Sequence, residues 1–268
     1  MFLYSLKKKQ NKYYSPGSGI TGNKKHYIMK KLSFIMAVAM LLCVSTMQAK
    51  NEKISYQIQA GLNLSQITSA DVDEVEGLDY KDGVKPGFNL GFRFDYQFND
   101  YFAVQTGLTY TMKGEKYKRS YNGEYYSTEQ KTKHTAHYFE IPILAGARYS
   151  INDDIQLKFN TGPYIAIGLG GKCKTKYEET NTGDTESHES WQQFFGDPEK
   201  EDSEGCKRFD AGWKFELGVD IKNYYVGLAY DLGFVDITNG DVKKANKDND
   251  NYKAMMNRNF SINVGYKF

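Results

Sequence analysis

The chain has 268 residues, with 25 Gly, 22 Tyr, 16 Phe and 5 Pro, and its mean hydropathy of −0.65 is too polar for a bundle of membrane helices. Its net charge of +2 hides an asymmetry, because residues 1–49 hold eight Lys and no acid, which leaves 27 Lys and Arg against 33 Asp and Glu in the remainder. The positive excess therefore belongs to the N-terminus, and this distribution argues against a nucleic-acid-binding protein.

The first 49 residues are predicted to lie outside the fold. Two lysines in 29–31, an apolar run over 32–46 and Met47-Gln48-Ala49 are typical of a secretory signal peptide, 29–49. The apolar run is shorter than a membrane-spanning helix. Residues 1–28 are polar, basic and aperiodic, and two explanations stay open: a non-native upstream extension with translation starting at Met29, or a cytoplasmic extension of the signal. The β-barrel domain predicted below then covers 50–268.

Segments with a period of two follow one another along 50–268. The first, 54–64, alternates apolar with polar residues, and the second, 87–98, sets Phe88, Phe92 and Phe94 against glycine, charged and amide residues. A strand with one aromatic face and one charged face suits lipid on one side and a narrow polar lumen on the other. The same alternation recurs over 102–112, 137–149, 155–170, 209–221, 224–234 and 260–268.

The connections between these segments alternate long and short. The short ones are 99–101, 152–154 and 222–223, and the long ones are 69–85, 113–135, 172–207 and 236–256. This pattern predicts an all-β fold, an eight-stranded antiparallel up-and-down transmembrane β-barrel with long outer loops, short periplasmic turns and both termini on the periplasmic side. The turn at Lys222 suits type I′. Pro142 is predicted to face Tyr164, with a bulge at this level because Pro142 and Pro163 each lack a backbone donor.

Several short motifs resemble one protein family. They are 60–65 (AGLNLS), 86–91 (PGFNLG), 138–142 (YFEIP), 161–164 (TGPY) and the closing 264–268 (VGYKF). As a set in this order they resemble the PorT-like outer-membrane β-barrel proteins, over most of 53–268. The resemblance implies location in the outer membrane of a Gram-negative bacterium. The family takes its name from a member needed for protein secretion and gliding in some Gram-negative bacteria, but no residue here marks that role. The terminal Phe268 resembles the aromatic residue by which the barrel-assembly machinery recognises many barrels.

Charged residues on the inward side of the predicted strands form the candidate site. An eight-stranded barrel is just wide enough for its own side chains to fill. The plain interpretation is a polar network that plugs the lumen, and the alternative is a proton or ion path. The predicted network consists of Arg93, Asp95, Glu140, Arg148, Lys158, Lys214, Glu216, Asp220 and Asp231.

Cys173 and Cys206 flank the longest predicted loop, and they are the two cysteines left after signal cleavage. The exported compartment is oxidising, so a disulfide between them is a candidate. The alternation of side chains along the neighbouring predicted strands places Cys173 on the outward face and Cys206 on the inward face. A bulge at Gly170-Gly171 would bring the two cysteines to the same face.

No spacing in the sequence predicts a catalytic, cofactor or metal site. His134 and His137 are three residues apart on one strand, which places them on opposite faces rather than in a two-His site. The acidic loop containing Asp71 and Asp79 lacks the ligand and glycine positions of an EF-hand.

The leading hypothesis is therefore a monomeric, non-enzymatic barrel that acts in the envelope or at the surface through its four long outer loops. Expected partners are outer-membrane lipid, the barrel-assembly machinery and a protein bound at those loops. Aromatics such as Tyr125, Tyr126, Trp191 and Phe195 are predicted to offer contact surface there. The alternatives are an accessory component of a secretion or envelope-assembly machine, a small pore, and an enzyme with its site at the barrel rim.

Overall fold

The computed structural model describes residues 53–68, 78–123, 126–181, 184–196, 203–238 and 254–268. The chain divides into two units, Met1–Ala49 and Lys50–Phe268, and the described residues all belong to the second. The predicted signal peptide and upstream extension therefore lie outside the described residues. No helix among those residues is long and apolar enough to cross a membrane.

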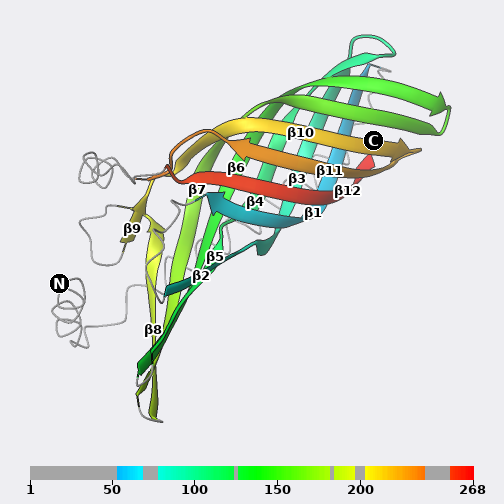
Figure 1. Cartoon of the computed structure of the whole chain (residues 1–268). Helices are drawn as coiled ribbons and strands as arrows, with labels where there is room; N and C mark the ends of the chain where they lie inside the picture. The colour runs from blue at the N-terminus through cyan, green and yellow to red at the C-terminus, as the bar shows by residue number, and fades with distance from the viewer. Residues whose placement is uncertain (1–52, 69–77, 124–125, 182–183, 197–202, 239–253) are drawn as a thin grey trace, which may run out of the picture. The chain divides into compact units, whose positions relative to one another are not determined.

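The described residues form twelve strands in one sheet (Figure 1). In chain order they are β1 (Ile54–Thr68), β2 (Leu78–Gly83), β3 (Lys85–Gln97), β4 (Phe102–Lys113), β5 (Lys116–Asn122), β6 (Tyr126–Asn152), β7 (Ile155–Asn181), β8 (Asp184–Phe195), β9 (Ser203–Cys206), β10 (Phe209–Ile221), β11 (Tyr224–Gly233) and β12 (Met256–Lys267).

Eight of these strands pair in a cycle, in which each has two antiparallel neighbours. The order is β1, β3, β4, β6, β7, β10, β11 and β12, and β12 returns to β1 with Leu62 opposite Ile262. The cycle closes on the other side through the pairing of β6 with β7. All eight correspond to the predicted period-two segments, so the positions of those strands are confirmed.

Four strands lie where the sequence analysis expected loops. β2 and β5 fall in the predicted loops 69–85 and 113–135, and β8 and β9 fall in 172–207. β6 and β7 also continue through these regions as 27-residue strands. The loop predictions were wrong there because these stretches lack the alternating apolar residues that marked the other strands, whereas their Thr and Tyr residues favour strands. Together β2, β5, β8 and the outer ends of β6 and β7 form a sheet that we call the extension.

The two faces of the cycle differ in chemistry. Large apolar side chains remain exposed on its outward face, including Leu62, Phe88, Ile143, Leu217 and Val264. Inward positions are instead filled by buried polar and charged side chains, as the alternating burial of β10 illustrates. A continuous exposed apolar surface of this kind marks contact with lipid rather than water.

The turns and irregularities differ from expectation in two places. Lys222 has φ of 54° and is the one non-glycine residue of the described chain with positive φ, which fits a II′ rather than a I′ turn. Pro142 does face Tyr164, but the β6–β7 register is unchanged on either side, so the predicted bulge is absent. Pro142 therefore leaves one backbone hydrogen bond of the sheet unmade, but no extra residue is inserted into either strand.

A register shift occurs instead between His137 and Tyr138, which pair with Gly170 and Gly168. Leu169 is the extra residue, and beyond it the inward side of β7 passes from even to odd positions, so that Cys173 is buried. The bulge thus lies one residue before the Gly170-Gly171 pair at which the sequence places it.

Candidate functional site

The nine charged residues predicted to line the lumen are all buried on the inward face of the cycle. They come from five strands, β3, β6, β7, β10 and β11, and Lys267 of β12 pairs with one of them, Asp220. Alternation along each strand points them inward, and the pairing of strands brings them to neighbouring heights. They divide into two connected clusters, which we call the outer cluster and the inner cluster.

The outer cluster is built around two lysines that share carboxylates. Lys113 Nζ lies 3.0 Å from Glu140, 3.5 Å from Asp210 and 3.9 Å from Asp231. Lys214 Nζ lies 2.8 Å from Glu140 and 2.5 Å from Asp231. Since three carboxylates face two ammonium groups, this cluster carries one excess negative charge.

Neutral side chains complete the outer cluster. Asn257 and Asn259 donate to Asp210 and Asp231 at 3.0 and 2.9 Å. The Tyr164 hydroxyl donates to Asp210 at 3.4 Å, and its ring lies 4.5 Å from Lys113 Nζ. These donors and the aromatic face replace the hydration that the buried charges lose, which is the condition for tolerating them in a dry interior.

The inner cluster continues the network toward the short turns. Arg148 donates to Asp95 at 2.9 Å and to Asn160 at 2.6 Å, and Asn160 in turn donates to Glu216 at 2.9 Å. Lys158 lies between Asp95 and Asp220, at 3.0 and 3.1 Å.

Two further cations complete the inner cluster. Arg93 is 3.9 Å from Glu216, and Lys267 is 3.1 Å from Asp220. The four cations of this cluster face three carboxylates. Its excess positive charge therefore balances the excess negative charge of the outer cluster.

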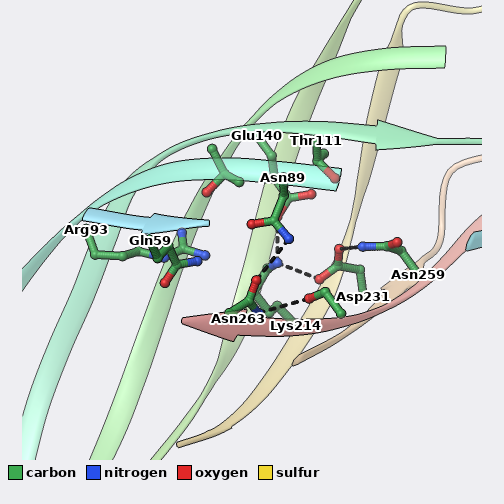
Figure 2. Close-up of a pocket in the computed structure, with 11 residues that line it drawn as sticks. Gln59, Asn89, Arg93, Thr111, Glu140, Lys214, Asp231, Asn259 and Asn263 are labelled. Carbon is green, nitrogen blue, oxygen red and sulfur yellow. Dashed lines mark hydrogen bonds and ion pairs between the residues drawn. The ribbon is translucent and has the colours of Figure 1, made fainter. Parts of the chain in front are cut away.

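Between the clusters lies a small cavity lined by polar side chains (Figure 2). The side chains drawn there include Gln59, Asn89, Arg93 and Asn263, and they converge on a cavity of about 10 Å³. Asn89 donates to Asn63 at 2.7 Å and to Asn263 at 2.9 Å, which links β1, β3 and β12 across the interior. A cavity of this size holds roughly one water molecule, so it offers no continuous aqueous path.

An apolar cluster lies beyond the outer cluster, and the sequence analysis missed it. Phe194 and Phe195 of β8 are buried against Ile67, Tyr138 and Ile237. The Phe195 ring meets the Tyr138 ring edge-on, with centroids 5.5 Å apart. Phe195 therefore is not the exposed contact surface that was predicted, whereas Trp191 is 65% exposed and remains available. Tyr125 lies outside the described residues.

Lys113 was not predicted to line the lumen, because the polar run that begins with it was assigned to a loop. Lys113 continues the inward odd positions of β4, where Gln105, Thr109 and Thr111 are buried too. That parity was the available signal. Gly114 and the polar run after it hid the signal, because they made the strand look finished.

The two histidines near the outer end of β6, His134 and His137, point to opposite faces of the sheet. His134 is buried, and its Nδ1 lies 2.9 Å from Glu115. His137 points outward, and its Nδ1 lies 2.6 Å from the hydroxyl of Tyr110. They do not converge on a common point. Within the described residues no group of three His, Cys, Asp or Glu is placed to hold a metal ion.

Cys173 and Cys206 are both buried, on β7 and at the end of β9. The disulfide between them stays a prediction. We expect peptide mapping of the unreduced protein by mass spectrometry to find the two cysteines in one linked fragment, because both pair with β8, Cys173 with Gln192 and Cys206 with Phe195, in an oxidising compartment. Two thiols that alkylate without prior reduction would contradict the bond.

The comparisons with known proteins place the chain in a family. A sequence model described as outer membrane protein beta-barrel domain matches residues 47–239. The chain belongs to this family. It is accordingly an outer-membrane protein, and its exposed apolar face contacts lipid. No curated protein matches the chain.

Three solved structures show a low similarity to this chain. Ail, the attachment invasion locus protein of Yersinia pestis, shares 17% identity at a TM-score of 0.33, with 80% of this chain and 98% of that chain covered. Neisserial surface protein A shares 14% at 0.34, covering 80% and 97%. OprG from Pseudomonas aeruginosa shares 15% at 0.31, covering 80% and 95%. Similarity at this level carries no functional information.

The small size of the cavity between the clusters leads to a prediction about conductance. We expect the purified protein in planar lipid bilayers to give no steady single-channel current, because the cavity between the clusters is about the size of one water molecule. A stable ohmic conductance would mean that the two clusters line an ion path rather than a plug.

Proposed function

We propose that the protein is an eight-stranded outer-membrane barrel with a side-chain-filled lumen, and that it acts as a surface interaction protein of a Gram-negative envelope. In this proposal the cycle of eight strands spans the membrane, and the extension stands outside the cell. The protein is a monomer and performs no catalysis, and the paired charges of its lumen stiffen the barrel.

The observation that carries this proposal is the length of β6 and β7. Their pairing runs from Tyr126 opposite Asn181 to Asn152 opposite Ile155. A tilted membrane strand uses about 10 residues, whereas 27 residues at ~3.3 Å each extend about 90 Å. More than half of this hairpin therefore lies beyond the membrane, and β2, β5 and β8 widen it into a sheet (Figure 1).

A paired sheet of this kind is a more specific interaction surface than four flexible loops. Its backbone is hydrogen-bonded, so a partner that binds it orders little new chain and loses less conformational entropy. Trp191 on β8 and the partly exposed ring of Tyr121 on β5 offer aromatic contact area. The charged edge of β8, with Glu186 and His188, discourages indiscriminate strand pairing.

The test trims the extension and leaves the cycle intact. Lys118 pairs with Lys131, and Lys176 pairs with Glu189, so residues 119–130 and 177–188 can each be replaced by an Asn-Gly turn. We expect proximity labelling on living cells to lose specific neighbours in the trimmed protein.

The control for that experiment is the closed barrel itself. Both proteins should still migrate differently on a gel before and after boiling, which reports a closed barrel that resists detergent. If the trimmed protein keeps this behaviour and labels the same set of neighbours as the full chain, the extension is not the interaction surface.

The alternative is an accessory component of a secretion or envelope-assembly machine, as in the PorT-like proteins. One observation favours it: four of the motifs that carry the resemblance pair with each other in the cycle, with Gly61 opposite Asn89 and Pro142 opposite Tyr164. They thus form two connected patches rather than scattered matches. A deletion strain with an unchanged set of secreted proteins would dismiss this role.

A further inference from the structure

Seven lysines lie together on one face of the extension. Lys81, Lys118, Lys131 and Lys176 stand directly opposite one another across β2, β5, β6 and β7. In the adjacent row Lys116, Lys133 and Lys174 do the same across β5, β6 and β7. We call these seven residues the lysine lattice. Like charges placed directly opposite in a sheet are destabilising, so two such rows call for a compensating anion.

The protein itself compensates the lysine lattice only in part. Glu129 binds both Lys118 and Lys131, and these two ammonium groups hold the pKa of its carboxyl below the usual range, chiefly by hydrogen bonding. Asp79, Glu189 and Glu178 pair with the three lysines at the edges, Lys81, Lys174 and Lys176, at 3.1, 2.8 and 2.5 Å.

Lys116 and Lys133 stand opposite each other at the centre of the lysine lattice. Neither has a carboxylate within ion-pair distance among the described residues. All seven lysines line one groove of about 520 Å³, and Asp82 is the one acidic residue among the residues that line it. The groove thus combines room for a ligand with an excess of positive charge.

The position of the lysine lattice along β6 indicates that it lies at the level of the lipid headgroups, whose phosphates are anions. Lys131 and Lys133 lie on the same outward face of β6 as His137, Phe139 and Ile141, because the alternation of β6 is unbroken over this stretch. The outward face therefore passes from apolar residues through His137 to lysines along one strand. Lys133 lies four positions before His137 in the chain, about 13 Å along the strand. On a strand tilted by about 45° this is roughly 9 Å along the membrane normal, which takes Lys133 to the outer edge of a headgroup layer about 5–8 Å deep.

Trp191 marks the same level. It stands opposite Lys174 on the outward face, it is 65% exposed, and Lys172 Nζ lies 5.1 Å from its ring. Exposed tryptophans beside lysines are typical of the layer where the membrane meets water. Basic clusters at this layer bind anionic lipid headgroups, since each lysine there contributes to binding.

We propose that the lysine lattice binds the phosphate groups of anionic lipid headgroups in the leaflet from which the extension emerges. The phosphates lie over Lys116 and Lys133 and relieve the repulsion between the rows, while the acyl chains lie against the apolar face below. This inference rests on the membrane placement of the eight-strand cycle in the proposed function.

The test compares lipids that differ in headgroup charge. The full chain is purified in neutral detergent micelles and titrated with dilauroyl phosphatidylglycerol or dilauroyl phosphatidylcholine, and native mass spectrometry counts the bound lipids. We expect the protein to prefer phosphatidylglycerol. The Lys116→Gln/Lys133→Gln variant should lose about thirtyfold in affinity for phosphatidylglycerol, with affinity for phosphatidylcholine unchanged.

Two matched variants control the test. Lys116→Arg/Lys133→Arg keeps the charge and should keep the preference, and Lys222→Gln removes an exposed lysine at the opposite end of the barrel, beside Asp154, and should do the same. Equal phosphatidylglycerol affinity in the Lys116→Gln/Lys133→Gln variant and the unmodified chain would overturn the proposal. So would inorganic pyrophosphate that binds the lattice as tightly as the lipid, because the site would then serve a free anion.

Failure of the barrel is distinguishable from failure of the lysine lattice. Each variant is run on a gel before and after boiling. An unmodified chain without a heat-dependent shift contradicts the proposed barrel, whereas a normal shift without headgroup preference contradicts the lattice alone.

Discussion

Replacing Lys113 by methionine is expected to destabilise the barrel by about 3–5 kcal/mol, the usual cost of leaving buried charges without their partner. Lys113 contacts Glu140, Asp210 and Asp231, and its side chain is 1% exposed. Without it three buried carboxylates face only Lys214. Methionine has similar length and no charge, so the loss reports electrostatics rather than a cavity. Urea unfolding in detergent micelles, followed by tryptophan fluorescence, measures the change.

The matched control is Lys118→Met in the extension. Lys118 also pairs with a carboxylate, that of Glu129, but its side chain is 39% exposed and the pair is hydrated. Exposed pairs of this kind contribute about 0–1 kcal/mol. Adding Asp210→Asn to Lys113→Met should recover part of the lost stability, because it removes one of the unpaired charges. Equal effects of Lys113→Met and Lys118→Met would show that the outer cluster does not hold the barrel together.

The strands of the cycle could be predicted from the sequence because each one faces lipid on one side and the polar lumen on the other. Every strand therefore alternates between apolar and polar residues. On β10 both ends were predicted at the residues where the structure has them, Phe209 and Ile221. Apolar residues on one side and charges on the other leave one register in which both faces are satisfied. The same alternation pointed Arg93 and Glu216 into the lumen before any partner was known.

The extension could not be predicted in the same way. Both faces of its sheet meet water or headgroups, so a strand such as β5, with Lys116, Lys118 and Arg119, shows no apolar period. β5 pairs with the next strand, β6, and also with β2, and the pairing with β2 joins distant segments, Leu78 with Tyr121, which leaves no mark in a single stretch of sequence. The lysine lattice is invisible for the same reason, because its rows join residues that lie up to 95 positions apart, from Lys81 to Lys176.

The two charged clusters in the lumen could be predicted in part from the sequence. The residue types and their inward direction followed from parity, but the partners did not. Lys113 is joined to Asp210 across almost 100 residues, and only the closing of the cycle brings β4 and β10 to the same interior. Pairing partners in a closed barrel depend on stagger between strands, which short turns alone do not specify.

Phe92→Arg is the second large effect that we expect. Phe92 is central among the outward side chains of β3, where it stands opposite Ile58 and Leu108 and its ring lies 5.9 Å from that of Tyr56. An arginine at the middle of the membrane costs about 2–4 kcal/mol in transmembrane barrels. Refolding into lipid vesicles, followed by the heat-dependent gel shift, should show a lower folded fraction and a lower urea midpoint.

The control is the same substitution at a residue nearer the membrane surface, Phe98. Phe98 lies just beyond the end of β3 that we propose to face the periplasm, is 55% exposed and packs against Tyr96. Near the membrane surface the same change to arginine costs about 0–1 kcal/mol, since the guanidinium reaches water. The proposed placement therefore requires Phe92→Arg to be clearly worse than Phe98→Arg. If the two variants refold equally well, the outward face of β3 does not cross the hydrocarbon layer, and the lysine lattice would lose its place at the headgroups as well.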